Sequence, residues 1–254
     1  MKKILITFLS LFSLALSSNV QIMHASSVGE VSISLNGKVA LKNVNYLDNT
    51  GLLKLDRNTV IGIKSNNGNT KVELNTNLLE NGDHIVTVVG PSYGSNEVQF
   101  VSSNLKSYSS SNSHFGLKVF NGFIDESPVD IFVNNQLAFE NLNYSQYSSY
   151  LMIDEGFQNV VVKDHFTGEE LGIFVINLIN RGGETGVLVL SGKFEREYAN
   201  LKLINPNGSA ISVVEMNLEA TGGNDNQNEE SRDITETAQV QIVHNSPYPV
   251  VDVY

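Results

Sequence analysis

The sequence predicts an all-β protein made of tandem antiparallel β-sandwich domains of immunoglobulin-like type. Short runs of alternating apolar and polar residues recur along the chain. Polar or glycine-containing turns separate these runs about every 8–15 residues, and no long segment has helical periodicity. This pattern favours an antiparallel sandwich over a closed barrel.

The composition supports folded domains without covalent cross-links. The chain has 254 residues, of which 41% are apolar, so about two domains with hydrophobic cores are expected. It contains no cysteine, so each domain must rest on its core alone. Attachment as a lipoprotein, which requires an acylated cysteine, is excluded for the same reason.

The N-terminus predicts a secretory signal peptide over residues 1–17. Lys2 and Lys3 give a positive start, residues 4–16 are apolar, and Ala15-Leu16-Ser17 fits a cleavage site before Ser18. The alternative is a short membrane anchor, but the apolar stretch is well below the roughly 20 residues that span a bilayer. We therefore expect a secreted or cell-surface protein of the outer envelope, with no membrane span in the mature chain.

The charge makes nucleic acid an unsuitable partner. The formal net charge is −11, and no basic stripe is present that would bind phosphates. Acidic residues are concentrated in residues 219–237, together with Gly, Asn and Gln. This segment is expected to be a disordered linker.

An internal repeat organises the rest of the chain. Val20-Gln21-Ile22-Met23-His24 near the start is answered by Val240-Gln241-Ile242-Val243-His244 near the end. A diverged middle copy begins at residues 117–122, with Asn121 at the histidine position. Such self-similarity is typical of repeated domains.

Two hairpin turns lie at matching places in the first two copies. Asn36-Gly37 and Asn134-Asn135 each separate alternating runs, and these residue types adopt positive φ readily. The expected boundaries are residues 19–103 for the first sandwich, 104–114 for a Ser/Asn-rich joint, 115–218 for the second sandwich, and 238–254 for the start of a third copy.

The third copy reaches only two strands before Tyr254. An isolated hairpin of two strands is marginally stable and leaves its edges open. Either the natural protein continues past Tyr254 or the hairpin docks onto a neighbouring domain. The first explanation is favoured.

Residues 240–247 contain a His-x-Ser-Pro motif, and Val251-Asp252-Val253-Tyr254 follows it. In these two motifs the start of each copy resembles the bacterial domain of unknown function 4397. The first copy keeps His24 but has Ser32 at the aspartate position, and the second keeps Asp130 but has Asn121 at the histidine position. The resemblance implies a secreted or cell-envelope β-sandwich, with no known activity.

The motif residues are interpreted as structural. His24 and His244 have the chemistry of a metal ligand or general base. Asn121 at the equivalent position makes a poor ligand and no base, so hydrogen bonds to the following turn are favoured. Asp130 and Asp252 are likewise expected to accept turn amides, because a Ser-His-Asp arrangement using Ser246 is broken in the other copies. No catalytic, cofactor or metal site is predicted.

Calcium is weighed at three acidic stretches. Residues 224–230 have the composition of a calcium loop without its spacing, which favours a solvated spacer. Asp125-Glu126 and Asp154-Glu155 are turn carboxylates at which weak calcium binding stays open.

Three tyrosines give the one hint of a binding surface. Tyr144, Tyr147 and Tyr150 stand close together among Ser and Gln, as in many adhesive or carbohydrate-binding surfaces. A packing role is the alternative, because Tyr144 has a counterpart in Tyr46.

The sequence thus predicts a non-enzymatic protein that acts as a structural spacer or adhesion surface. Its partner would be an unknown extracellular protein or glycan. The alternative is a set of accessory modules of a larger secreted hydrolase, whose catalytic domain would lie beyond residue 254.

Overall fold

The computed structural model describes residues 17–216, except 67, 69, 92–96, 107–112, 124–126 and 193–199. Residues 1–16 of the predicted signal peptide, the acidic linker and the third copy lie outside the described residues. His244 and Asp252 therefore have no structural account.

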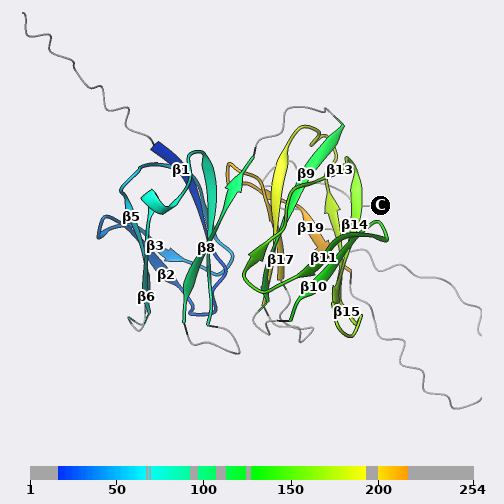
Figure 1. Cartoon of the computed structure of the whole chain (residues 1–254), viewed down its shortest axis with the longest axis horizontal. Coiled ribbons are helices and arrows are strands. Elements are labelled where there is room, and N and C mark those ends of the chain that lie inside the picture. Colours follow the sequence, from blue (N-terminus) through cyan, green and yellow to red (C-terminus); the bar gives the residue numbers. More distant parts are fainter. Residues whose placement is uncertain are drawn as a thin grey trace, which may run out of the picture. The chain divides into compact units, whose positions relative to one another are not determined.

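The first sandwich is built from residues 17–105 (Figure 1). Inner sheet 1 has the order β4-β1-β7-β8 and consists of β1 (Ser17–His24), β4 (Asn49–Asp56), β7 (Asp83–Val89) and β8 (Gln99–Leu105). Outer sheet 1 has the order β3-β2-β5-β6 and consists of β2 (Val31–Leu35), β3 (Lys38–Val44), β5 (Val60–Ser65) and β6 (Lys71–Asn75). A short 3-10 turn, η1 (Thr76–Leu78), precedes β7.

The second sandwich follows the same plan over residues 114–215. Inner sheet 2 has the order β12-β9-β16-β17-β18, and β13 also pairs with β9. Its strands are β9 (His114–Phe123), β12 (Gln146–Tyr147), β13 (Leu151–Asp154), β16 (Thr185–Gly192), β17 (Asn200–Ile204) and β18 (Ala210–Ile211). Outer sheet 2 has the order β11-β10-β14-β15-β19, with β10 (Val129–Val133), β11 (Gln136–Leu142), β14 (Phe157–Asp164), β15 (Glu170–Asn177) and β19 (Val213–Glu215).

The predicted all-β sandwich architecture is confirmed. Apart from η1, the described elements are strands, and most neighbouring strands are antiparallel. Two pairs are parallel, β1 with β7 and β9 with β16. Alternation along a strand predicts which side chains face the core, but it does not reveal which distant strand lies beside it.

Each sandwich has its own hydrophobic core. In β10, Val129, Ile131 and Val133 are buried while the residues between them are partly exposed, as a period of two requires. These side chains join the core of the second sandwich, and Val20, Ile22, Ile33, Ile61 and Val86 belong to the equivalent core of the first.

A third buried cluster joins the two inner sheets. It combines residues of β1, β7 and β8, and Ala25 directly after β1, with residues of β9, β16 and β17. Its members are Met23, Ala25, Ile85, Val89, Leu105, Phe120, Val187, Val189 and Ile204. The sequence predicted a Ser/Asn-rich joint between the sandwiches but not this apolar contact. Residues 17–216 accordingly belong to one compact unit.

Candidate functional site

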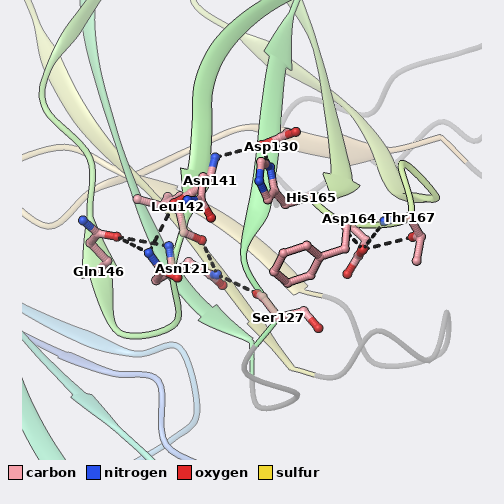
Figure 2. A network of polar contacts seen from close by, with 11 residues as sticks. Asn121, Ser127, Asp130, Asn141, Leu142, Gln146, Asp164, His165 and Thr167 are labelled. Carbon is pink, nitrogen blue, oxygen red and sulfur yellow. Dashed lines mark hydrogen bonds and ion pairs between the residues drawn. The ribbon is translucent and has the colours of Figure 1, made fainter.

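The repeat-motif residues of the second sandwich gather where β9, β11 and β14 end and β10 begins (Figure 2). Asn121 is fully buried there. Its Nδ2 donates to the carbonyl oxygens of Ser127 (3.3 Å) and Leu142 (2.9 Å), and its Oδ1 accepts the backbone N–H of Phe123 (3.1 Å). One amide side chain thus holds three segments of backbone.

His24 occupies the corresponding position in the first sandwich and makes corresponding contacts. Its Nδ1 accepts the backbone N–H of Ser26 (3.4 Å), and its Nε2 lies 2.7 Å from the carbonyl oxygen of Gly29. The carbonyls of both residues accept an equivalent amide, from Leu47 for His24 and from Ser145 for Asn121. Because Nδ1 accepts a hydrogen bond and Nε2 donates one, the His24 ring must be the neutral tautomer with its hydrogen on Nε2.

Burial adds to this preference for the neutral ring. His24 is almost inaccessible to solvent. The burial lowers the pKa of His24, although the Gly29 hydrogen bond and the Asp48 charge act in the opposite direction. His24 is therefore a neutral side chain that stabilises the turn between β1 and β2 through its hydrogen bonds to Ser26 and Gly29.

Asp130 and His165 form a carboxylate–imidazole pair in the second sandwich. The Oδ1 of Asp130 accepts the backbone N–H of Asn141 (2.8 Å) and lies 2.9 Å from Nδ1 of His165 (Figure 2). Sequence analysis did not single out His165, because it lies 35 residues from Asp130 along the chain. In the first sandwich, Ser32 and Asn66 make the analogous contact, with 3.4 Å between Oγ and Oδ1.

The turn after β14 is organised by Asp164. Its Oδ1 accepts the backbone N–H groups of Phe166 (3.0 Å) and Thr167 (2.8 Å) and the Thr167 hydroxyl (3.0 Å). Burial alone would raise the pKa of Asp164, but these bonds and one from the Ser127 hydroxyl outweigh it and lower the pKa. The Ser127 hydroxyl thus serves Asp164, whereas the Asp130 carboxylate orients His165.

In the two hairpin turns, at Asn36-Gly37 and Asn134-Asn135, an asparagine side chain also accepts a backbone N–H group. Asn36 and Gly37 have φ of 51° and 77°, and Asn134 and Asn135 have φ of 49° and 64°. The Oδ1 of Asn36 accepts the N–H of Val60 (2.8 Å), and the Oδ1 of Asn134 accepts the N–H of Asn159 (3.0 Å). Each side chain ties its hairpin to the neighbouring strand.

The three tyrosines lie at the contact between the sandwiches, not on an open patch. All three are partly buried. The Tyr147 hydroxyl bonds to the Thr87 hydroxyl of β7, and its ring lies 4.4 Å from that of Phe120. Tyr144 packs against the shared cluster, and the Tyr150 hydroxyl accepts the backbone N–H of Lys106 (3.3 Å). Sequence alone cannot separate exposed tyrosines from tyrosines that face another domain.

Lys118 of β9 crosses the same contact. Only 6% of this lysine is exposed. Its Nζ donates to the Ser103 hydroxyl (2.6 Å) and the Asn104 carbonyl (3.0 Å), and it lies 4.6 Å from the centre of the Tyr150 ring. Burial, followed by the nearby Lys106 charge, lowers the pKa of Lys118 to about 8.

Two glycines allow the start of β4 in the first sandwich to meet the turn between β17 and β18 in the second. Gly51 and Gly208 have φ of 65° and 91°. A Cβ on Gly208 would lie 2.6 Å from the Cα of Gly51, and a Cβ on Gly51 would lie 2.8 Å from the carbonyl oxygen of Asn207. Both the backbone conformation and the close approach therefore exclude larger side chains.

Of the acidic stretches considered for calcium, only the one at Asp154 lies in the described part of the chain. Asp154 lies 3.3 Å from the imidazole of His114, whereas Asp125, Glu126 and residues 224–230 lie outside the described part. Within the described part, no three His, Cys, Asp or Glu side chains form a group that could hold a metal ion. In the same part, none of the helical structure is long and apolar enough to cross a membrane.

Comparison with known proteins identifies one domain family. No curated protein matches the chain. Residues 115–182, which run from β9 to the segment after β15, match the family model described as Domain of unknown function (DUF4397). The family resemblance seen in the sequence is therefore confirmed for the second sandwich, whose residues 115–182 carry the DUF4397 match.

Proposed function

We propose that this chain is an exported, non-enzymatic protein whose two sandwiches act together as a stiff spacer or adhesion module outside the cell. The observation that carries the proposal is the buried cluster shared by the inner sheets. Domains joined only by a linker move relative to each other, whereas a hydrophobic contact suppresses this motion. A stiff pair of domains can hold a partner at a fixed distance from its attachment point.

The polar motif residues support a structural role. The side chains of His24, Asn121 and Asp164 form hydrogen bonds with the backbone of neighbouring turns. Asp130 binds backbone and His165, and the corresponding pair in the first sandwich is Ser32 with Asn66. Serine and asparagine, which are neutral, thus take the positions of Asp130 and His165 in the first sandwich. A carboxylate and an imidazole are therefore not needed for the contact at this position.

Stiffness is tested by a distance measurement between the sandwiches. The chain has no cysteine, so Arg57→Cys with Glu169→Cys provides two unique exposed sites for spin labels. Double electron–electron resonance should give one narrow distance distribution. A broad distribution for the otherwise unchanged protein would overturn the stiff spacer.

The shared cluster supplies the matching variant. Val189→Asp places a charge in the fully buried contact and should broaden the distribution. Val39→Asp changes a valine of β3 that is 49% exposed and should leave it unchanged. Circular dichroism of both variants checks that the strands remain folded.

Export is tested by recovering the protein from its native cells by fraction. We expect it outside the cytoplasm, with Ser18 as its first residue. Recovery in the cytoplasm with residues 1–17 still attached would overturn export. The intact mass also bears on the accessory-module alternative, since that alternative requires a larger protein that contains a hydrolase domain.

A further inference from the structure

Outer sheet 2 has a row of apolar side chains across its outward face. Strand register aligns Leu137 with Phe132, Phe132 with Val161, and Val161 with Ile173. These four residues come from β11, β10, β14 and β15. Phe132, Val161 and Ile173 alternate with the core residues of their strands, and a register shift in β11 between Phe139 and Leu137 sets Leu137 opposite Phe132. They therefore point away from the core of the second sandwich.

The apolar surface continues beside this row. Val175 pairs in register with Val214 of β19, and the N–H of Met216 bonds to the carbonyl of Ile173. Leu137, Val214 and Met216 are 49%, 58% and 52% exposed. Monomeric proteins rarely expose a contiguous apolar surface of this kind unless it binds something.

The first sandwich provides an internal comparison. In outer sheet 1, register aligns Val39 with Ser34, Ser34 with Gly62, and Gly62 with Glu73. These are the positions of Leu137, Phe132, Val161 and Ile173 in the same strand order. Apart from Val39 these residues are polar or glycine, and the row lines a shallow hollow of about 380 Å³ instead of an apolar surface. The fold therefore does not require an apolar row at these positions.

We propose that the outward face of outer sheet 2 binds the same face of a second copy of this chain. The chain itself shows that flat sheets of this fold pack on one another, because the two inner sheets do so. Those two sheets already cover each other, and the row of outer sheet 1 has one apolar side chain, Val39, where outer sheet 2 has four. Of the four described sheets, outer sheet 2 thus finds its best apolar match in outer sheet 2 of another molecule.

The charges beside the row permit this approach. Lys163 lies 3.1 Å from Glu170, and His165 lies 2.9 Å from Asp130. Glu170 therefore has a basic partner on this face, and Asp130 lies against the His165 imidazole. Two chains with a net charge of −11 can meet where such pairs offset a local charge. A contact of one patch with itself has twofold symmetry and closes as a dimer.

The test is analytical ultracentrifugation of the chain over a wide concentration range. We expect a reversible dimer. Phe132→Ser with Ile173→Glu gives the row the residues of outer sheet 1 and should weaken the dimer by at least about thirtyfold, as for loss of a hot-spot residue. Val39→Ser alters the matching exposed position of outer sheet 1 and should leave the dimer unchanged.

Three outcomes would overturn the proposal. One is a monomer at all concentrations, and another is a dimer that the double variant does not weaken. The third is equal weakening by Val39→Ser. Circular dichroism and urea unfolding of the double variant separate loss of the contact from loss of the fold, and Leu137→Ser alone, at an exposed edge position, gives a milder second measurement.

Discussion

Gln21 and Lys118 occupy the same position in β1 and β9, and each reaches across to the same position in the other sandwich. Gln21 pairs with Ile85 of β7, as Lys118 pairs with Val187 of β16. Gln21 Nε2 donates to the carbonyl of Asn205 (3.3 Å), and Lys118 Nζ donates to the carbonyl of Asn104 (3.0 Å). The contact between the sandwiches is therefore approximately twofold symmetric, like the contact of a homodimer.

Other pairs across this contact follow the same relation approximately. Lys202 of β17 donates to the carbonyl of Leu47, which follows β3. Gln99 of β8 donates to the hydroxyl of Ser145 (3.2 Å), which follows β11. In both directions a strand of one inner sheet binds the equivalent loop of the other sandwich.

Because of Lys118, the free energy of unfolding should change with pH in the alkaline range. The pKa of Lys118 falls from the ordinary 10.5 to about 8 in the folded chain. Between these values the unfolded chain holds more protons, so the free energy of unfolding should rise with pH. Lys118→Gln, which places the residue of position 21 here, should remove this rise.

Urea unfolding between pH 8 and 9.5 measures the Lys118 effect. Higher pH is avoided because burial raises the pKa of Tyr147, so ionisation of this phenol costs stability above its ordinary pKa of about 10. An equal slope in the wild type and Lys118→Gln would contradict the prediction.

His24 should tolerate asparagine better than leucine. Asparagine can accept from Ser26 and donate to the turn, as Asn121 does in the second sandwich. Leucine leaves the Ser26 N–H and the Gly29 carbonyl without their partner, at a cost of about 1–3 kcal/mol. Urea unfolding at pH 7 measures both variants, and equal losses would show that only the volume of the ring matters.

The same histidine should contribute to acid sensitivity. Burial lowers the pKa of His24 below its ordinary 6.5. Its contribution to stability is complete above pH 6.5 and decreases below it, because the unfolded chain then takes up a proton that the folded chain resists. His24→Asn should flatten the fall in unfolding free energy between pH 7 and pH 5. An unchanged fall would assign it to other groups.

Asp164 should stabilise the turn between β14 and β15. Asp164→Ala removes the acceptor for Phe166 and Thr167, and we expect a loss of about 1 kcal/mol at pH 7. The pKa of Asp164 is lowered, so this contribution is present above its ordinary 3.8 and lost as the pH falls through the folded-state value. Glu169→Ala, in the same turn, is the control.

Gly208 should be more sensitive to alanine than Gly156. Both have positive φ, 91° and 102°, so alanine is strained at either site. A Cβ at Gly208 also meets the backbone of Gly51 at 2.6 Å, whereas nothing lies within 4 Å at Gly156. Thermal unfolding should show roughly 1 kcal/mol of loss for Gly156→Ala and a larger loss for Gly208→Ala. Equal losses would mean that the loop moves to make room.

The sequence by itself determined the local features of this protein. Alternation predicted the strands, and Asn36-Gly37 and Asn134-Asn135 predicted the hairpins, because the information for a tight turn lies within a few residues. Comparison of the repeated motifs also directed attention to His24 and Asn121, which bind the neighbouring backbone in corresponding ways. The family resemblance rested on the same short segments.

Only the tertiary structure decided which faces meet. The parallel pairing of β1 with β7, the pairing of His165 with Asp130, and the packing of the two inner sheets all join residues distant in sequence. Periodicity places a side chain on one face of a strand but does not say what covers that face. Tyr147 shows the consequence, since its neighbours in sequence suggested an exposed binding patch and its neighbours in space make it part of a domain contact.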